Sequence, residues 1–123
     1  MKTILLAEDD SFIIDIYALG LRKEGYRVDI AKDCEIALEK IKNSYPDLLI
    51  LDIDFGSEKM DGCKLLKIIR SDPGIKSLKV IVISNLEQKD YPENIDNLGV
   101  IKFFLKVQNT PEEIVNAVKK ILK

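Results

Sequence analysis

Four consecutive apolar residues, Leu48 to Leu51, are followed at once by the carboxylate of Asp52. An apolar run of this length without polar alternation is typical of a strand buried on both faces, as in a parallel sheet covered by helices. Asp52 then stands where the strand leaves the core. Ligands of open parallel sheets bind beyond the carboxyl ends of the strands. This stretch therefore predicts an α/β fold with Asp52 in its functional site.

Strand-like and helix-like segments alternate along the rest of the chain. Short apolar or alternating runs predict strands at 3–7, 27–31, 48–52, 80–83 and 100–105. Apolar residues at helical spacing predict helices over 11–24, after the caps Asp33 and Asp61, and after the capping box of 110–113, with a short, weakly anchored helix within 86–98. This alternation predicts a flavodoxin-like (βα)5 sandwich of three layers, with a parallel sheet in the order 2-1-3-4-5 and the strand 27–31 at its edge.

Length and composition favour a single domain. The 123 residues are expected to form one domain over 1–123, and 19 basic against 21 acidic residues give a net charge of −2. There is no dense basic run of the kind that binds nucleic acid, and no apolar run reaches the roughly 18–20 residues of a membrane span. The two cysteines, Cys34 and Cys63, form no metal or disulfide pattern, and the chain has no histidine. We therefore expect a cytoplasmic protein without zinc or imidazole chemistry.

Two acids follow the first predicted strand, and the predicted strand order brings them to Asp52. Glu8 and Asp9 come directly after the strand at 3–7, and the neighbour of that strand in the predicted sheet is the strand at 48–52. Clustered carboxylates repel one another unless a cation neutralises them, and an all-oxygen set of ligands suits Mg²⁺. An aspartate can itself accept a phosphoryl group. We therefore interpret Asp52 as a nucleophile, although the acids from Glu8 to Asp10 could instead only cap the following helix.

Two further strands end in residues suited to a phosphoryl group. The Ser84 hydroxyl could donate a hydrogen bond to a phosphoryl oxygen, or else cap the next helix. The Lys106 ammonium could pair with the phosphoryl charge, or else be a solvated surface lysine. Asp61-Gly62 predicts a turn and a helix cap without chemistry, and both cysteines are expected to be small core residues.

This ordered set, with an acid pair after the first strand and an Asp, a Ser and a Lys after three later strands, resembles the receiver domain of two-component response regulators, and the resemblance covers the whole chain. The residues that carry it are Glu8-Asp9, Asp52, Met60-Asp61-Gly62, Ser84, Gly99 and Lys106. The resemblance implies that Asp52 is phosphorylated and that Ser84 and Lys106 bind the phosphoryl group. It also implies a Mg²⁺ site made of Glu8, Asp9, Asp52 and the backbone carbonyl of Asp54. Phe103 stands at the family's aromatic switch position, or is an ordinary strand aromatic.

The resemblance further implies a signalling domain that promotes only its own phosphorylation and dephosphorylation, and is no enzyme for other substrates. Its donor would be the phosphohistidine of a histidine kinase or of a histidine phosphotransfer protein. Phosphorylation would switch the face formed by 86–98, the strand at 100–105 and the last helix, so that this face binds a downstream protein target or a second copy. No output domain, nucleic acid or membrane partner is expected.

Several positions depart from the family's pattern. The loop 53–60 is longer than usual, Asn85 stands where a small residue is usual, and Val107 replaces a proline that follows a cis bond. We expect a trans bond before Val107, because a cis bond without proline costs about 3 kcal/mol. Asp54 and Leu86 are expected to tune dephosphorylation, and Asn85 to slow phosphorylation unless it only caps a helix.

Two other interpretations stay open. Asp52-Ile53-Asp54 also resembles the Asp-x-Asp motif of haloacid dehalogenase-like phosphatases, but their motif follows the first strand and a further acidic site follows the lysine. A degenerate receiver that only binds protein partners would explain the altered loops. A phosphatase would turn over an aryl phosphate many times, a receiver would label itself once, and a degenerate receiver would do neither.

Overall fold

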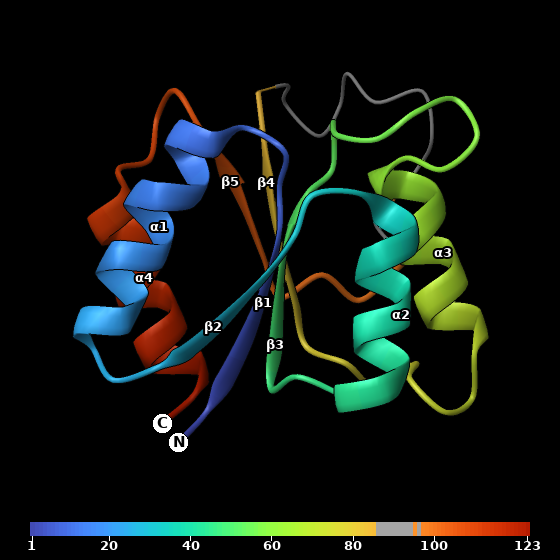
Figure 1. Ribbon diagram of the computed structural model, residues 1–123, viewed down its shortest axis with the longest axis horizontal. Helices are drawn as coiled ribbons and strands as arrows, with labels where there is room; N and C mark the ends of the chain where they lie inside the picture. Colours follow the sequence, from blue (N-terminus) through green and yellow to red (C-terminus); the bar gives the residue numbers. More distant parts are fainter. Residues whose placement is uncertain (86–94, 96) are drawn as a thin grey trace.

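Five strands form one parallel sheet that lies between two layers of helices (Figure 1). The computed structural model describes residues 1–85, 95 and 97–123. The strands are β1 (Thr3–Ala7), β2 (Arg27–Ala31), β3 (Leu48–Asp52), β4 (Val80–Ser84) and β5 (Lys102–Leu105). They pair in the order β2-β1-β3-β4-β5, all in parallel, so the predicted flavodoxin-like order with β2 at the edge is confirmed.

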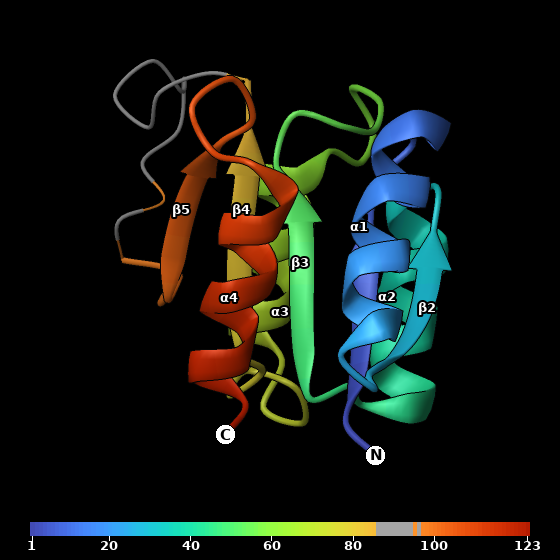
Figure 2. The same cartoon turned by 90° about the vertical axis from the view of Figure 1, so that its left-hand side faces the viewer.

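The helices of the described chain are α1 (Ser11–Lys23), α2 (Cys34–Ser44), α3 (Gly62–Ser71) and α4 (Pro111–Ile121). α1 and α4 cover one face of the sheet, and α2 and α3 cover the other (Figures 1 and 2). The helix predicted within 86–98 falls mostly on 86–94 and 96, which lie outside the described residues. Its two expected anchors, Ile95 and Leu98, pack against the core under α2 and α3.

Both faces of the central strands are buried, which explains their uninterrupted apolar runs. Leu49 and Leu51 face the core under α2 and α3, whereas Leu48 and Ile50 face the core under α1 and α4. All four side chains are fully buried. Burial of such a side chain is worth roughly 1.5–3 kcal/mol, so a polar residue in this strand would be costly. Asp52 is the first position at which the strand can carry one.

Each described helix begins at a side-chain cap. The N-caps are Asp10, Asp33, Asp61 and Thr110. The capping box of Thr110 with Glu113 and the first-turn proline Pro111 are present as predicted. These caps satisfy amide groups that the first helical turn leaves without intrahelical partners.

Three element boundaries differ from the prediction, and one of them is the end of β4, which extends one residue further than predicted, to Ser84. α1 ends at Lys23 because Glu24 is its C-cap and Gly25 takes a left-handed conformation with a φ of 89°. β5 begins at Lys102, two residues later than predicted, because Gly99 has a φ of 65° and the chain is still turning into the sheet there.

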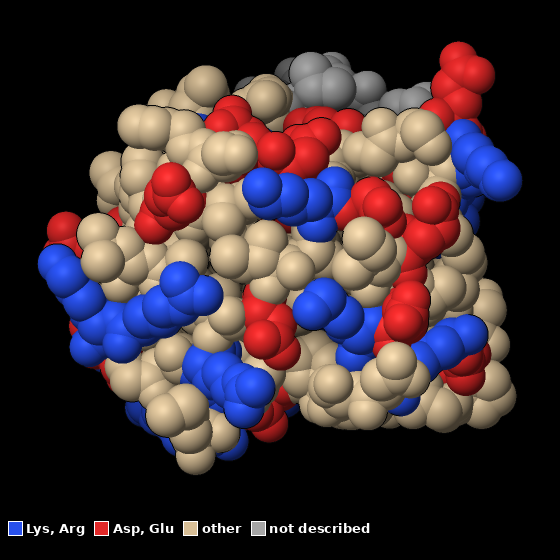
Figure 3. All heavy atoms as spheres, in the orientation of Figure 1, with Lys and Arg blue, Asp and Glu red and all other residues tan. Residues whose placement is uncertain are grey.

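The carboxyl ends of the strands meet along the upper edge of the molecule (Figures 1 and 2). Acidic side chains gather near this edge on the face drawn in Figure 3, while basic and acidic side chains alternate over the rest of that face. Across the residues that the structure describes, none of the helices has the length and apolar character needed to cross a membrane.

Candidate functional site

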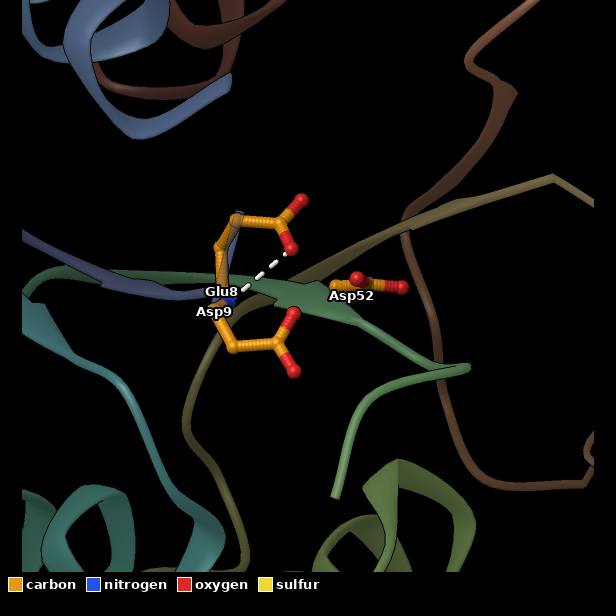
Figure 4. A group of neighbouring side chains, drawn as sticks. All are labelled: Glu8, Asp9 and Asp52. Carbon is orange, nitrogen blue, oxygen red and sulfur yellow. Dashed lines mark hydrogen bonds between the residues drawn. The ribbon is translucent and has the colours of Figure 1, made fainter. Parts of the chain in front are cut away.

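The sheet brings Glu8, Asp9 and Asp52 together at the carboxyl ends of β1 and β3. Ala7 pairs with Leu51 in the parallel ladder, so the next residues, Glu8 and Asp52, lie side by side. One carboxylate oxygen from each of the three acids lies within 4.8 Å of the other two (Figure 4). This group could hold a metal ion.

The surroundings of the three acids differ. Glu8 is 0% exposed and Asp52 is 3% exposed, whereas Asp9 is exposed. Oε2 of Glu8 accepts hydrogen bonds from the backbone N–H groups of Asp9 at 3.0 Å and Asp10 at 3.3 Å. Oε1 of Glu8 is buried, and its partner among the described residues is the Lys106 ammonium, at 2.8 Å. Asp10 is the cap of α1, bonded at 2.9 Å to the N–H of Phe12, so capping does not account for Glu8 and Asp9.

Lys106 reaches the same point from the end of β5. Its Nζ lies 3.0 Å from Oδ2 of Asp52 and 2.8 Å from Oε1 of Glu8, and its side chain is only 11% exposed. Lys106 is therefore not the solvated surface lysine of the alternative interpretation. Its backbone N–H also donates to the carbonyl of Ser84 at 2.7 Å, which fixes β5 beside β4 at the site.

Burial and the neighbouring charges shift the pKa values of Asp52 and Glu8 in opposite directions. Burial, reinforced by Glu8, raises the pKa of Asp52 to about 7 although Lys106 opposes the shift. Burial also acts to raise the pKa of Glu8, but its contacts with Asp52 and Lys106 outweigh it and lower that pKa. Burial alone would lower the pKa of Lys106, but the two carboxylates raise it, so the ammonium stays charged. The cluster thus has more acid than one lysine can neutralise.

Ser84 and Asp54 are joined by a contact that the sequence analysis did not foresee. Ser84 is fully buried at the end of β4, and its hydroxyl lies 2.9 Å from Oδ2 and 3.2 Å from Oδ1 of Asp54. The backbone N–H of Asn85 donates to the same Oδ2 at 2.8 Å. The backbone N–H of Asp54 in turn donates to Oδ1 of Asp52 at 3.0 Å. No local spacing signals this arrangement, because the partners are 30 and 31 residues apart.

For the other candidate residues, the structure gives a position and a degree of burial but does not test the predicted role. Phe103 is half-buried on β5 against the core under α2 and α3, and its switch role stays a prediction. Asn85 is exposed, and its effect on phosphorylation also stays a prediction. Leu86 and the helix that Asn85 could cap lie outside the described residues. Cys34 and Cys63 are buried core residues, and burial raises the pKa of the Cys34 thiol to about 12.

The lengthened loop after β3 is folded against the protein. Gly56 and Asp61 form an antiparallel bridge, the N–H of Gly62 donates to the carbonyl of Phe55 at 3.1 Å, and the Phe55 side chain is buried. A Cβ atom on Gly62 would lie 2.6 Å from the backbone of Ile53, so glycine is required where α3 meets the residue after Asp52. The described chain contains no cis peptide bond, in agreement with the trans bond predicted before Val107.

Comparison with known proteins adds an independent finding. The family model of the response regulator receiver domain matches residues 4–119. The alkaline phosphatase synthesis transcriptional regulatory protein PhoP of Bacillus subtilis is 29% identical over 99% of this chain and 49% of its own length. The chemotaxis protein CheY of Treponema pallidum is 29% identical over 98% of this chain and 82% of its own length. This chain thus spans about half the length of the PhoP protein.

Solved structures agree with this result. A CheY-like response regulator receiver domain protein from Methanospirillum hungatei superposes with a TM-score of 0.84 at 28% identity, covering 99% of this chain and 94% of that one. The family model spans nearly the whole chain, and the sheet order and site geometry agree with it. The chain therefore belongs to the family of response regulator receiver domains of two-component signalling systems.

Proposed function

We propose that this receiver domain accepts a phosphoryl group on Asp52 from a phosphohistidine donor, in a reaction that depends on Mg²⁺. The observation that carries the proposal is the position of Asp52, held at the end of a buried strand beside the Lys106 ammonium and the acids Glu8 and Asp9. In this step an Asp52 oxygen forms a bond to phosphorus while the bond from phosphorus to the donor's imidazole nitrogen breaks, and the electron pair leaves with the imidazole.

The residues around Asp52 fit Mg²⁺. The three acids offer oxygen ligands alone, which suits a hard cation, and the Lys106 ammonium is shared between two buried carboxylates, those of Glu8 and Asp52. Glu8, Asp9 and Asp52 would hold the ion, together with the backbone carbonyl of Asp54. Bound there, Mg²⁺ supplies positive charge that offsets the charge of the phosphoryl group.

The remaining site residues would hold the product. Lys106 already contacts Asp52, so its ammonium can stay beside the phosphoryl oxygens after transfer. The buried Ser84 hydroxyl, one strand further along the sheet, would donate a hydrogen bond to a phosphoryl oxygen. Phe103 would change its position with Ser84 as the switch forms.

The proposed donor is a histidine kinase or a histidine phosphotransfer protein, and the output is binding of a downstream protein or a second copy of the chain. Two exposed apolar side chains adjoin the site in sequence: Phe12, 71% exposed, follows the acid cluster, and Val107, 80% exposed, follows Lys106. Residues 1–123 would act as one domain in the cytoplasm, without nucleic acid or membrane as a partner.

The decisive experiment is the intact mass of the protein after incubation with Mg²⁺ and acetyl phosphate. Wild-type protein should gain one phosphoryl group, labile to acid and base, and Asp52→Asn should gain none. Asp10→Asn is the matched control, because Asn caps a helix as well as Asp does and should leave labelling intact. Repeated turnover of an aryl phosphate would indicate a phosphatase, and no label under any condition would indicate a degenerate receiver.

A further inference from the structure

A second carboxylate, that of Asp54, ties the end of β4 to the loop after β3. It accepts the Ser84 hydroxyl at 2.9 and 3.2 Å and the Asn85 N–H at 2.8 Å. The backbone N–H of the same residue donates to Oδ1 of Asp52 at 3.0 Å. Asp54 therefore contacts the proposed phosphoacceptor through its backbone and the proposed switch residue through its side chain.

The bond from Ser84 to Asp54 competes with the bond that Ser84 would make to a phosphoryl group. A hydroxyl has one proton to donate, and here that proton is directed to a carboxylate, which is a strong acceptor. Donation to a phosphoryl oxygen on Asp52 requires this bond to break. Because Ser84 is fully buried, water cannot freely replace either acceptor, so the hydroxyl has two mutually exclusive arrangements.

We propose that the Asp54 carboxylate is a latch that holds Ser84 and the Asn85 backbone in the unphosphorylated arrangement, and that phosphorylation of Asp52 releases both together. The proposal rests on the proposed function. Two features couple the release to the phosphorylation of Asp52. Attachment of phosphorus changes how strongly the Asp52 carboxyl group accepts the hydrogen bond from the Asp54 N–H. The phosphoryl group also brings negative charge toward the Asp54 carboxylate.

The exposure of Asp54 lets its carboxylate remain stable in either arrangement of Ser84. The Asp54 residue is exposed, so its carboxylate can be hydrated once Ser84 leaves it. Stabilising the unphosphorylated arrangement must weaken formation of the phosphorylated one by the same free energy. Asp54 is therefore a positioning residue that acts through Ser84.

The test measures the rate of Asp52 labelling by acetyl phosphate at saturating Mg²⁺ in a double-mutant cycle of Asp54→Ala and Ser84→Ala. Removal of the latch should speed labelling roughly tenfold when Ser84 is present, the factor that about 1.4 kcal/mol in the barrier provides, which is close to the net contribution of one hydrogen bond. In the Ser84→Ala background the same change should have little effect. Glu58→Ala, which removes an exposed acid from the same loop, is the control and should leave the rate unchanged.

Each outcome separates the latch from other roles. A gain that persists in the Ser84→Ala background would mean that Asp54 acts only by charge repulsion, and an unchanged or slower rate with lower thermal stability would mean a structural tie; either result overturns the latch. A second readout is hydrogen exchange of the Asn85 amide, which should become faster in Asp54→Ala and on phosphorylation of the wild-type protein. If wild-type protein is labelled but the Asn85 amide stays protected, the latch is wrong while the proposed function stands. If neither wild type nor Asp54→Ala is labelled, both fail.

Discussion

Asp52 and Glu8 are buried side by side, and among the described residues one ammonium, that of Lys106, contacts both carboxylates. This crowding stores unfavourable electrostatic energy in the folded protein. The pKa of Asp52 rises from 3.8 to about 7, so the folded protein binds this proton more tightly than the unfolded chain does. The contribution of Asp52 to the free energy of unfolding therefore falls as the pH rises from 3.8 to about 7 and stays low above that.

Replacement of this carboxylate should stabilise the metal-free protein. Asp52→Asn removes the charge that is costly at neutral pH, so its free energy of unfolding should exceed that of the wild type by about 1–3 kcal/mol at pH 8, since one pKa unit corresponds to about 1.4 kcal/mol. The gap should shrink at pH 5, where wild-type Asp52 is protonated. Urea denaturation at the two pH values measures it. If the difference in free energy of unfolding is equal at the two pH values, or if Asp52→Asn is less stable than the wild type at pH 8, the carboxylates do not repel one another as inferred.

Magnesium should relieve the same repulsion. If the ion binds the folded protein and not the unfolded chain, the melting temperature must rise with its concentration. Asp9→Ala removes one exposed oxygen ligand and should abolish most of the rise, while Asp10→Asn keeps the helix cap and should retain it. Thermal melts with MgCl₂, matched in ionic strength by NaCl, give the comparison. Equal shifts in the wild type and Asp9→Ala would place the ion elsewhere.

Among the elements, the loop between β5 and α4 positions Lys106 without the usual proline. Asn109 closes this loop on itself: its Oδ1 accepts the Leu105 N–H at 3.1 Å, and its own N–H donates to the Leu105 carbonyl at 3.0 Å. Its Nδ2 also donates to Glu113 at 3.2 Å, and Glu113 completes the capping box of α4. The side chain of Asn109 therefore links the end of the strand to the start of the helix.

Loss of this link should loosen the loop. Asn109→Ala should lower the free energy of unfolding by about 1–2 kcal/mol, because the side-chain hydrogen bonds to the Leu105 N–H and to Glu113 are both lost. Labelling of Asp52 by acetyl phosphate should slow as well, since Lys106 is the next residue along the chain from Leu105. Asn116→Ala, on the exposed side of α4, is the matched control. Unchanged labelling in Asn109→Ala would mean that the sheet alone positions Lys106.

Across the whole molecule, Arg70 joins three separate segments. From the end of α3, its guanidinium donates to the carbonyls of Lys76 and Leu78 before β4 and of Leu98 and Gly99 before β5. The distances run from 2.6 to 3.2 Å. These contacts lie at the amino ends of β4 and β5, at the opposite edge of the sheet from Asp52.

Arg70 should therefore serve stability and not phosphorylation. Arg70→Ala leaves four carbonyls without their donor and should lower the free energy of unfolding by roughly 2–3 kcal/mol. Arg70→Lys should recover little of the loss, because an ammonium cannot reproduce the planar fork of donors. Denaturant unfolding measures both, with the exposed Lys120→Ala as control. Full stability in Arg70→Lys would show that charge alone suffices there.

The overall architecture was predictable because it depends on local periodicity. The runs 48–51 and 80–83 indicate buried parallel strands, Asp33, Asp61 and Thr110 mark helix starts, and the alternation of strands and helices leads to the observed strand order. That order brings Glu8 and Asp9 to Asp52, so the acid cluster was predictable too. The patterns that mark a buried strand or a helix cap involve residues close together in the chain, which is why the sequence alone shows them.

The network among the site residues depends on contacts that no local pattern encodes. Lys106 pairs with Glu8 as well as Asp52, the Asp54 carboxylate accepts Ser84 and Asn85, and the loop after Asp52 forms its own bridge. A sequence states which side chains are available, but hydrogen bonds between residues 30 or more positions apart depend on sub-ångström placement by packed strands. Periodicity thus determines the fold and the location of the acids, whereas tertiary packing determines which hydrogen-bond and ion-pair partners each acid has.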